Sequence, residues 1–355
     1  MDLKRYFHKK KLRPLIGVDI GSHTLKLVEF SLNGSTLVLR RIGRALVPQN
    51  AIQDGVIKDP EAVEATLKAL IQNLRPKFKR AATSVSGYSV IVKKINVPYG
   101  DEREIEDNLI FDAENYVPFE IEDVYLDFSV TGQAKGAMET EIFLVAAKRE
   151  IVDSYAELLQ NTGLRPSVID VDDFALGNAF EGAMGNIRDS VVLMDLGASK
   201  STFCIVRDGM PLFTRDMSMG GRQITRAIAE TLGIGFNEAE KLKIKGSDHV
   251  VVLSDVSAVI KEIVEEWAHE VKKAVEFFIS TARPEEFPEY VWISGGSSLL
   301  NGISDVFEGV IGLETRRFDP FKNVAKDEKI HRSYLHAVAP QFAIAAGLAL
   351  RTEDI

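Results

Sequence analysis

Two aspartates, Asp19 and Asp195, each stand at the end of a short apolar run and directly before a glycine turn. Small and hydroxyl-bearing residues fill each turn, and a second apolar run follows it. That run ends in an Asn-Gly pair at residues 33–34 in one copy and in an Asp-Gly pair at residues 208–209 in the other, 14 and 13 residues after the aspartate. Such pairs supply the positive φ angles of two-residue hairpin loops, so both segments are predicted to be β-hairpins.

The chemistry that these hairpins suggest is the binding of a polyphosphate. A glycine after the acid removes the Cβ that would keep an anion away from backbone N–H groups. Two hairpins facing each other could hold phosphates from both sides, with Asp19 and Asp195 holding a hydrated Mg²⁺. Two ordinary hairpins are the alternative, because Asp-x-Gly turns are common. The repetition at matched spacing favours the ligand site.

A third glycine turn follows the apolar run that ends at Ser294. Its residues Gly295, Gly296 and Ser297 open a predicted helix, where free N–H groups and the helix dipole favour a phosphate or a ribose. The three motifs in this order resemble the phosphate-1, phosphate-2 and adenosine motifs of the actin-like ATPase superfamily. The single-loop signatures G-x-x-x-x-G-K-[ST] and G-x-G-x-x-G do not occur.

Length and composition bound the class of protein. A chain of 355 residues with 45% hydrophobic and 27% charged residues is long enough for two soluble domains. Its single cysteine, Cys204, excludes an internal disulfide and favours the cytoplasm. The net charge of −9 argues against general nucleic-acid binding. The longest apolar stretch, residues 337–350, is too short to span a membrane and is predicted to be one core helix.

Charge is distributed unevenly along the chain. Residues 101–127 hold eleven acids and one arginine, whereas residues 1–14 form a basic arm with six lysines and arginines. The arm is predicted to be either a disordered tail or, through Leu3, Tyr6 and Phe7, a weak contact with an anionic membrane surface.

Hydrophobic periodicity places the elements around the motifs. Helices are predicted over residues 61–74, 101–116, 150–161, 222–232 and 254–281, and strands over residues 83–87, 89–92, 124–130 and 141–147. The sequence pattern changes at Pro98, where an α+β insert is predicted to begin, and the main fold is predicted to resume at Pro166. The predicted units are a basic arm (1–14), a first lobe (15–97, 166–190 and 335–355), an insert (98–165) and a second lobe (191–334).

Within the actin-like superfamily, the chain resembles the type IV pilus assembly protein PilM family, which shares its domain plan with the division protein FtsA. The resemblance rests on residues 19–29, 114–128, 168–180 and 195–199, of which the acidic Tyr-Val-Pro-Phe stretch is the most specific. It implies an α/β, actin-like two-lobed fold of duplicated ribonuclease-H-like domains with a small insert, and ATP with Mg²⁺ as cofactors. His23 and Lys200 depart from the family's usual residues at their positions.

The resemblance also implies roles for individual residues. Asp19 and Asp195 would organise Mg²⁺, and Lys26 is either a phosphate contact or a surface lysine. The nucleotide-binding residues implied are Gly21, Ser22, His23, Thr24, Lys26, Gly197, Ala198, Ser199, Lys200, Ser201, Gly220, Gly221, Glu238, Lys241, Gly295, Gly296 and Ser297. Glu238 and Lys241 have an alternative reading as a solvated helix pair. Asp172 or Asp173 would position the attacking water, although an aspartate at a helix start is often an N-cap.

The implied function is a nucleotide-gated scaffold at the periphery of the inner membrane, with slow or absent ATP hydrolysis. Its partner would be the cytoplasmic N-terminal segment of a PilN-like membrane protein, with pilus motor ATPases and the platform protein as further partners. A filament-forming ATPase like FtsA or MreB is an alternative, which the lack of an amphipathic tail after Leu350 disfavours. A small-molecule kinase of the same fold is a third reading, for which no committed base stands out.

A partner groove is predicted where the insert meets the first lobe, over residues 88–97 and 115–128. Aromatic and apolar side chains alternate there with acids, which suits an extended peptide with apolar anchors and a basic flank. The predicted contacts are Tyr88, Val92, Tyr116, Phe119, Glu120, Glu122, Tyr125 and Phe128. The alternative is that the aromatic residues form the insert's own core.

Overall fold

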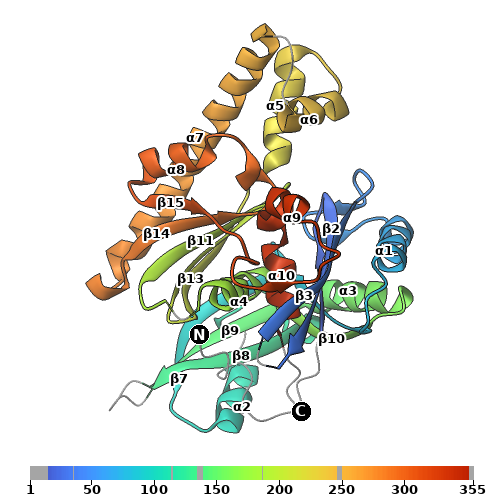
Figure 1. The fold of residues 1–355 in the computed structure, drawn as a ribbon. Coiled ribbons are helices and arrows are strands. Elements are labelled where there is room, and N and C mark those ends of the chain that lie inside the picture. Colours follow the sequence, from blue (N-terminus) through green and yellow to red (C-terminus); the bar gives the residue numbers. More distant parts are fainter. Residues whose placement is uncertain are drawn as a thin grey trace.

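Two mixed β-sheets define the two lobes of the molecule (Figure 1). The computed structural model describes residues 15–34, 36–112, 115–133, 139–185, 187–245 and 250–351, so the predicted basic arm lies outside the described residues. The first-lobe sheet contains, in order, β10 (Arg165–Val171), β6 (Arg80–Val85), β1 (Ile16–Ile20), β2 (Thr24–Asn33), β3 (Thr36–Leu46) and β16 (Ala325–Lys326). The second-lobe sheet contains β13 (Met210–Met217), β12 (Ser201–Arg207), β11 (Ser190–Leu196), β14 (Pro288–Ser294) and β15 (Glu314–Arg317).

The two sheets are built on the same plan. A central strand, β1 or β11, pairs antiparallel with the next strand of its hairpin and parallel with a later strand on its other side. Both predicted hairpins are present. Asp208 and Gly209 have the expected positive φ, of 50° and 76°. In the first hairpin Gly34 has it, with φ of 62°, but Asn33 does not, because it is still paired with Thr36 at the end of β2. The sequence repeat therefore corresponds to a structural repeat.

Two helices fill the space between the sheets. Helix α10 (Ala343–Ala349) is buried there along its whole length, and α4 (Asp172–Met184) buries six of its 13 residues. Close approach depends on glycine, because a Cβ at Gly17 would lie 1.9 Å from the Ala345 carbonyl oxygen and one at Gly347 would lie 1.7 Å from the Ala175 carbonyl oxygen.

The single helix predicted over residues 337–350 is wrong. The segment divides into α9 (Arg332–Val338), a 3₁₀ turn η6 (Ala339–Phe342) and α10. Pro340 lies in the turn, where its missing N–H and its ring do not interrupt an α-helix.

Helices also cover the outer faces of both sheets. In the first lobe these are α1 (Pro60–Leu74), capped by the Asp59 side chain, and α3 (Arg149–Asn161), with the small hairpin of β4 (Ile52–Gln53) and β5 (Val56–Ile57) beside them. In the second lobe they are α5 (Gly221–Leu232), α6 (Phe236–Lys245), α7 (Val250–Thr281) and α8 (Ile303–Ile311), with short 3₁₀ turns η4 (Pro284–Glu286) and η5 (Ser297–Leu299).

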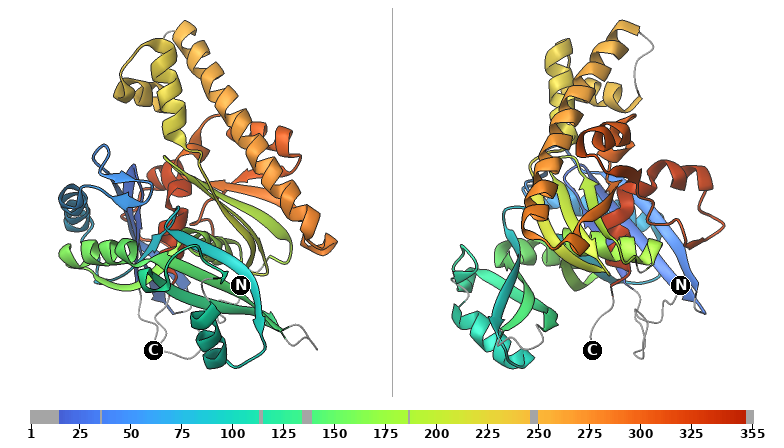
Figure 2. Two further views of the ribbon diagram at one scale, coloured as in Figure 1. Left: turned by 180° about the vertical axis from the view of Figure 1, so that it is seen from behind. Right: turned by 90° about the vertical axis from the view of Figure 1, so that its left-hand side faces the viewer.

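The insert is a three-stranded sheet with one helix, and it projects from the first lobe (Figure 2). Its strand order is β7 (Val90–Pro98), β9 (Glu139–Lys148), β8 (Val124–Gln133), with α2 (Glu102–Asp112) on one face and the turn η3 (Ile121–Asp123) before β8. The insert thus runs from β7 to β9 rather than over residues 98–165, because α3 packs on the first-lobe core. Likewise β16 returns to the first-lobe sheet before residue 335. Among the described residues, no helix has the length and apolarity needed to cross a membrane.

Candidate functional site

A cavity of about 340 Å³ lies between the lobes, and the turns of both repeated hairpins line it. Most of the residues predicted for the phosphate and metal sites are brought together there. Those that line the cavity are Asp19, Gly21, Ser22, His23, Thr24, Lys26, Asp195, Gly197, Ala198, Ser199 and Lys200. The two hairpins therefore face each other across one shared space.

The tips of the two turns are in direct contact. The hydroxyls of Ser22 and Ser199 are 2.9 Å apart and share a hydrogen bond between the lobes. Arg222, at the start of α5, donates a hydrogen bond of 2.7 Å to the carbonyl oxygen of Ser22. The lobes thus meet at the residues whose backbone N–H groups were predicted to hold phosphates.

In the first hairpin, the acid has a cation within its own strand pair. Asp19 and Lys26 are direct neighbours in the register of β1 and β2, and Lys26 Nζ donates a bond of 2.7 Å to Asp19 Oδ2. Both side chains are 13% exposed. Burial raises the pKa of Asp19 more than Lys26 lowers it.

In the second hairpin, the register places an uncharged residue opposite the acid. Asp195 pairs with Thr202 across β11 and β12, and its nearest donor is the Ser294 hydroxyl at 3.0 Å. Burial is the main reason that the pKa of Asp195 is raised to about 7, although Lys26 lowers it.

The chemistry of these acids fits a magnesium ion. Asp172 raises the pKa of both Asp19 and Asp195, and Asp19 also raises that of Asp195, so negative charge is concentrated in the cavity. Mg²⁺ is commonly held by one or two carboxylates together with water and phosphate oxygens. Among the described residues there is no group of three or more His, Cys, Asp or Glu side chains that could hold a metal by itself. The fit is therefore to a hydrated ion shared with a ligand.

The two candidates for positioning water differ sharply. Asp172 lines the cavity and accepts hydrogen bonds of 2.6 and 2.5 Å from the hydroxyls of Ser84 and Ser86. Asp173 does not line it, and its Oδ1 is buried without a hydrogen-bond partner within the part of the chain that the structure describes. Burial raises the pKa of Asp173 well above its usual range.

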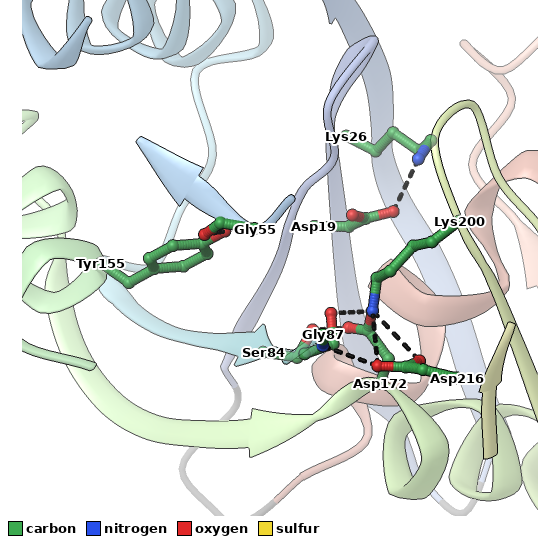
Figure 3. Close-up of polar contacts among 10 residues, drawn as sticks. Asp19, Lys26, Gly55, Ser84, Gly87, Tyr155, Asp172, Lys200 and Asp216 are labelled. Carbon is green, nitrogen blue, oxygen red and sulfur yellow. Dashed lines mark hydrogen bonds and ion pairs between the residues drawn. The ribbon is translucent and has the colours of Figure 1, made fainter. Parts of the chain in front are cut away.

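Lys200 joins Asp172 to the second lobe (Figure 3). Its Nζ lies 3.4 Å from Asp172 Oδ2 and 3.3 Å from each carboxylate oxygen of Asp216, a residue of β13. Asp216 Oδ2 also accepts a bond of 2.6 Å from the backbone N–H of Gly87, which precedes β7. Burial lowers the pKa of Lys200, but Asp172 and Asp216 outweigh this and raise it.

On the nucleoside side of the cavity, the structure contributes Gly221, Gly296 and Ser297 as expected. Glu238 and Lys241 are exposed and do not line it; Glu240 and Lys243 of the same helix do. Lys243 Nζ contacts Glu240 at 2.8 Å and the Gly221 carbonyl oxygen at 3.0 Å. The expected pair is thus replaced by a second Glu-x-x-Lys pair two residues further along.

Three predicted residues have structural contacts instead of positions on the cavity wall. Ser201 is fully buried and donates to the Met219 carbonyl oxygen at 2.8 Å. A Cβ at Gly220 would lie 2.6 Å from Ala198, and one at Gly295, where φ is 85°, would lie 2.4 Å from the Leu196 carbonyl oxygen. These glycines allow the phosphate-2 turn to pack against its neighbours.

The sequence did not single out the apolar part of the cavity wall. Phe236, Ile244, Leu299 and Leu300 line it together with Arg222. Their only signal was proximity to the third glycine turn and to the Glu-x-x-Lys helix. An apolar wall beside polar turns suits a ligand with one flat apolar end and one charged end.

The fold and this geometry are shared with known proteins. A sequence model of the family described as Type IV pilus assembly protein PilM matches residues 17–353. The chain belongs to the PilM family. A chain in the solved PilM-PilN type IV pilus biogenesis complex is 28% identical, covers 97% of this chain and 99% of its own, and superposes with a TM-score of 0.86.

More distant relatives confirm the actin-like fold of this PilM-family chain. Cell division protein FtsA of Enterococcus hirae is 22% identical over 354 residues, covering 86% of this chain and 78% of that protein. MreB5 of Spiroplasma citri bound to ADP is 13% identical with a TM-score of 0.51, and the match covers 94% of each chain. The predicted two-lobed actin-like class is therefore correct.

The residues predicted for the partner groove of this PilM-family chain lie on two faces of the insert sheet. Phe128 and Tyr116 pack against the insert core beneath α2, as the alternative interpretation anticipated. Val92 lies opposite Val145, and Tyr125 opposite Ala147, on the other face. Of these two, Tyr125 is 41% exposed.

The remaining predicted contacts lie at one end of the insert sheet, where β7 and β8 begin and β9 ends. Glu120 and Glu122 are exposed around η3, and the Lys148 ammonium lies 5.3 Å from the Phe119 ring centroid. Tyr88 is 80% exposed and its hydroxyl lies 2.9 Å from that of Ser218 in the second lobe. The eight residues therefore do not line one continuous groove.

Proposed function

We propose that this PilM-family chain binds ATP with Mg²⁺ between its lobes and that the nucleotide controls how it holds a PilN-like partner. The observation that carries the nucleotide site is the meeting of two glycine turns, joined by Ser22 and Ser199, above two buried acids. Backbone N–H groups of both turns bind the phosphates, and the apolar wall near Phe236 accepts the base.

Asp19 and Asp195 hold the magnesium ion through its water shell. The ion, when bound, neutralises phosphate charge and orients the phosphates. Lys26 donates directly to Asp19 and favours its ionised form, whereas Asp195, with a pKa of about 7, loses its proton as the cation arrives. Solved MreB5 structures bound to ADP and to AMPPNP support a nucleotide in this fold.

Hydrolysis is slow or absent in this proposal. Asp172 is engaged by the hydroxyls of Ser84 and Ser86, and Asp173 does not line the cavity. A free carboxylate in reach of a water is what general-base catalysis requires. Steady-state assays should give far less than about ten turnovers per second, the middle of the enzyme range. A rate near that value would make the scaffold role secondary.

The partner is the cytoplasmic N-terminal segment of a PilN-like membrane protein, which would hold this chain at the inner membrane. The solved PilM-PilN complex supports a partner of this kind. Acids exposed at the insert, Glu120 and Glu122, suit a basic flank of an extended peptide. Motor ATPases and the platform protein are further proposed partners of the same assembly.

One titration tests the cleft and the partner surface together. The full chain is titrated with a PilN-like N-terminal peptide, with and without ATP and Mg²⁺. The double variant Glu120→Lys with Glu122→Lys is expected to slow association several-fold and to reduce its salt dependence. A matched control, Glu262→Lys with Glu266→Lys, changes the same charge at exposed positions of α7 and should leave the rate unchanged. An unchanged rate in the first variant places the groove elsewhere.

A further inference from the structure

Lys200 is a residue of the cavity wall whose side chain contacts acids of both lobes. Its ammonium lies between Asp172, at the start of α4 in the first lobe, and Asp216, on β13 of the second (Figure 3). The three groups together carry a net charge of −1. Charges of opposite sign at 3.3 to 3.4 Å hold the lobes together at this point.

The two acids do not depend on Lys200 alone. Asp172 also accepts from Ser84 and Ser86, and Asp216 also accepts from the backbone N–H of Gly87. A carboxylate that keeps such donors stays hydrogen-bonded when an ammonium leaves it. Lys200 is therefore the exchangeable member of the cluster.

The backbone of Lys200 is part of the phosphate-2 turn itself. A Cβ at Gly197 would lie 2.5 Å from the Lys200 carbonyl oxygen, so the turn closes tightly around these residues. A terminal phosphate held by the turn lies within reach of a side chain with a flexible four-carbon stem. Lys26 also lines the cavity, but it is held at 2.7 Å by its cross-strand neighbour Asp19.

We propose that Lys200 is the residue by which this chain distinguishes a nucleoside triphosphate from a diphosphate. The terminal phosphate draws the ammonium away from Asp172 and Asp216, and a diphosphate leaves it in place. The inference rests on the proposed nucleotide site and names its specificity-determining residue. A phosphate with close to two negative charges and three acceptor oxygens competes well against two carboxylates that have other donors.

The exchange has a direct structural consequence. The Lys200 to Asp172 contact between the lobes gives way to a contact between one lobe and the nucleotide. It does so next to Gly87 and Tyr88, which contact Asp216 and Ser218 and lead directly into β7 of the insert. The terminal phosphate is thereby connected to the insert through Lys200, Asp216 and Gly87.

Calorimetry on the full chain with Mg²⁺ and either AMPPNP or ADP tests the inference. Lys200→Met is expected to weaken AMPPNP binding about tenfold and to change ADP binding less than about twofold. Lys200→Arg keeps the charge and should retain most of the preference for AMPPNP. The matched control is Lys273→Met, which removes an exposed lysine paired with Glu270 on α7 and should change neither affinity.

A second variant separates the exchange of Lys200 from simple repulsion between Asp172 and the phosphate. Asp172→Asn weakens the hold on Lys200 and is expected to raise the AMPPNP preference about threefold, opposite in sign to Lys200→Met. In the Lys200→Met background this gain should vanish. If it persists, Asp172 acts on the phosphate directly and the exchange is refuted.

The outcomes also separate the inference from the function on which it rests. A parent chain that binds neither nucleotide overturns both. A parent chain that binds both, with an unchanged ratio in Lys200→Met, overturns the inference alone.

Discussion

The two hairpins have the same backbone plan but opposite electrostatic arrangements. In the first, the acid Asp19 faces Lys26 across the strand pair and is neutralised within its own hairpin. In the second, Asp195 faces Thr202, and the lysine stands in the turn, from which it reaches Asp172 of the opposite lobe. A structural repeat therefore does not imply a chemical repeat.

The difference assigns separate properties to the two hairpins. Lys26 stays charged, because Asp19 and Asp195 raise its pKa more than burial lowers it, and the first hairpin carries little net charge. The second hairpin holds an acid with a pKa of about 7 and a cation that bridges the lobes. We expect the first hairpin to stabilise the fold and the second to respond to ligands and pH.

The largest expected effect is on stability. Lys26→Met leaves Asp19 buried without its cation and should lower the free energy of unfolding by about 3 kcal/mol at pH 8. The loss should be smaller at pH 5, where a proton replaces the cation. Lys200→Met should lose less than about 1 kcal/mol, because its acids keep other donors. Urea denaturation of both variants measures the difference, and equal losses would contradict the contrast between the hairpins.

Next in size is the pH dependence of stability. The folded pKa of Asp195, about 7, lies above its unfolded value, so the folded state holds the proton more tightly and stability falls as pH rises from about 4 to 7. Asp195→Asn removes this fall, so the free energy of unfolding of the variant should rise relative to that of the parent between pH 4 and pH 8. Asp19→Asn should instead destabilise at both pH values, since it leaves Lys26 buried and unpaired. If the free energy of unfolding depended on pH in the same way for the two variants, the different roles assigned to Asp19 and Asp195 would be refuted.

The effect on Mg²⁺-dependent ATP binding is expected to be of intermediate size. Asp195→Ala should weaken ATP binding about tenfold in the presence of Mg²⁺ and leave binding without Mg²⁺ almost unchanged, because a ligand to metal-bound water is lost. Calorimetry with and without the ion provides the measurement. Identical affinities for variant and parent under both conditions would exclude Asp195 from the metal site.

The smallest effect concerns the contact between the two turns. A double-mutant cycle of Ser22→Ala and Ser199→Ala should give a coupling energy of about 0.5 to 1 kcal/mol, as expected for one partly buried hydrogen bond. A coupling near zero would mean that the two hairpins meet without a specific interaction in solution.

The sequence could predict the hairpins because their determinants are local. Glycine and asparagine or aspartate at the loops select positive φ, and the apolar runs select buried strands. It could not predict that Lys200 pairs with Asp172 and Asp216, which lie 28 and 16 residues away on different elements. The contact with Asp172 depends on how the lobes pack, and the contact with Asp216 depends on the register between β12 and β13.

Helix phase explains the misplaced pair on α6. The segment holds two overlapping Glu-x-x-Lys pairs, 238 with 241 and 240 with 243, two residues apart. Two residues turn a helix by about 200°, so the pairs occupy opposite faces, and the pattern alone does not say which face meets the cavity. The same limit applies to Tyr125 and Phe128, whose odd separation along a strand places them on opposite faces of the insert sheet.

Helix α10 has a consequence for the order in which the chain can fold. It packs against β1 and α4 through Gly17 and Gly347, so the core of the first lobe joins residues separated by more than 300 positions. The strands of the second-lobe sheet, by contrast, all come from one stretch of the chain, which runs from β11 to β15. During synthesis, the second lobe can therefore assemble while the first still lacks the helix that covers β1, and a chain that stalls before residue 343 exposes that apolar surface to aggregation.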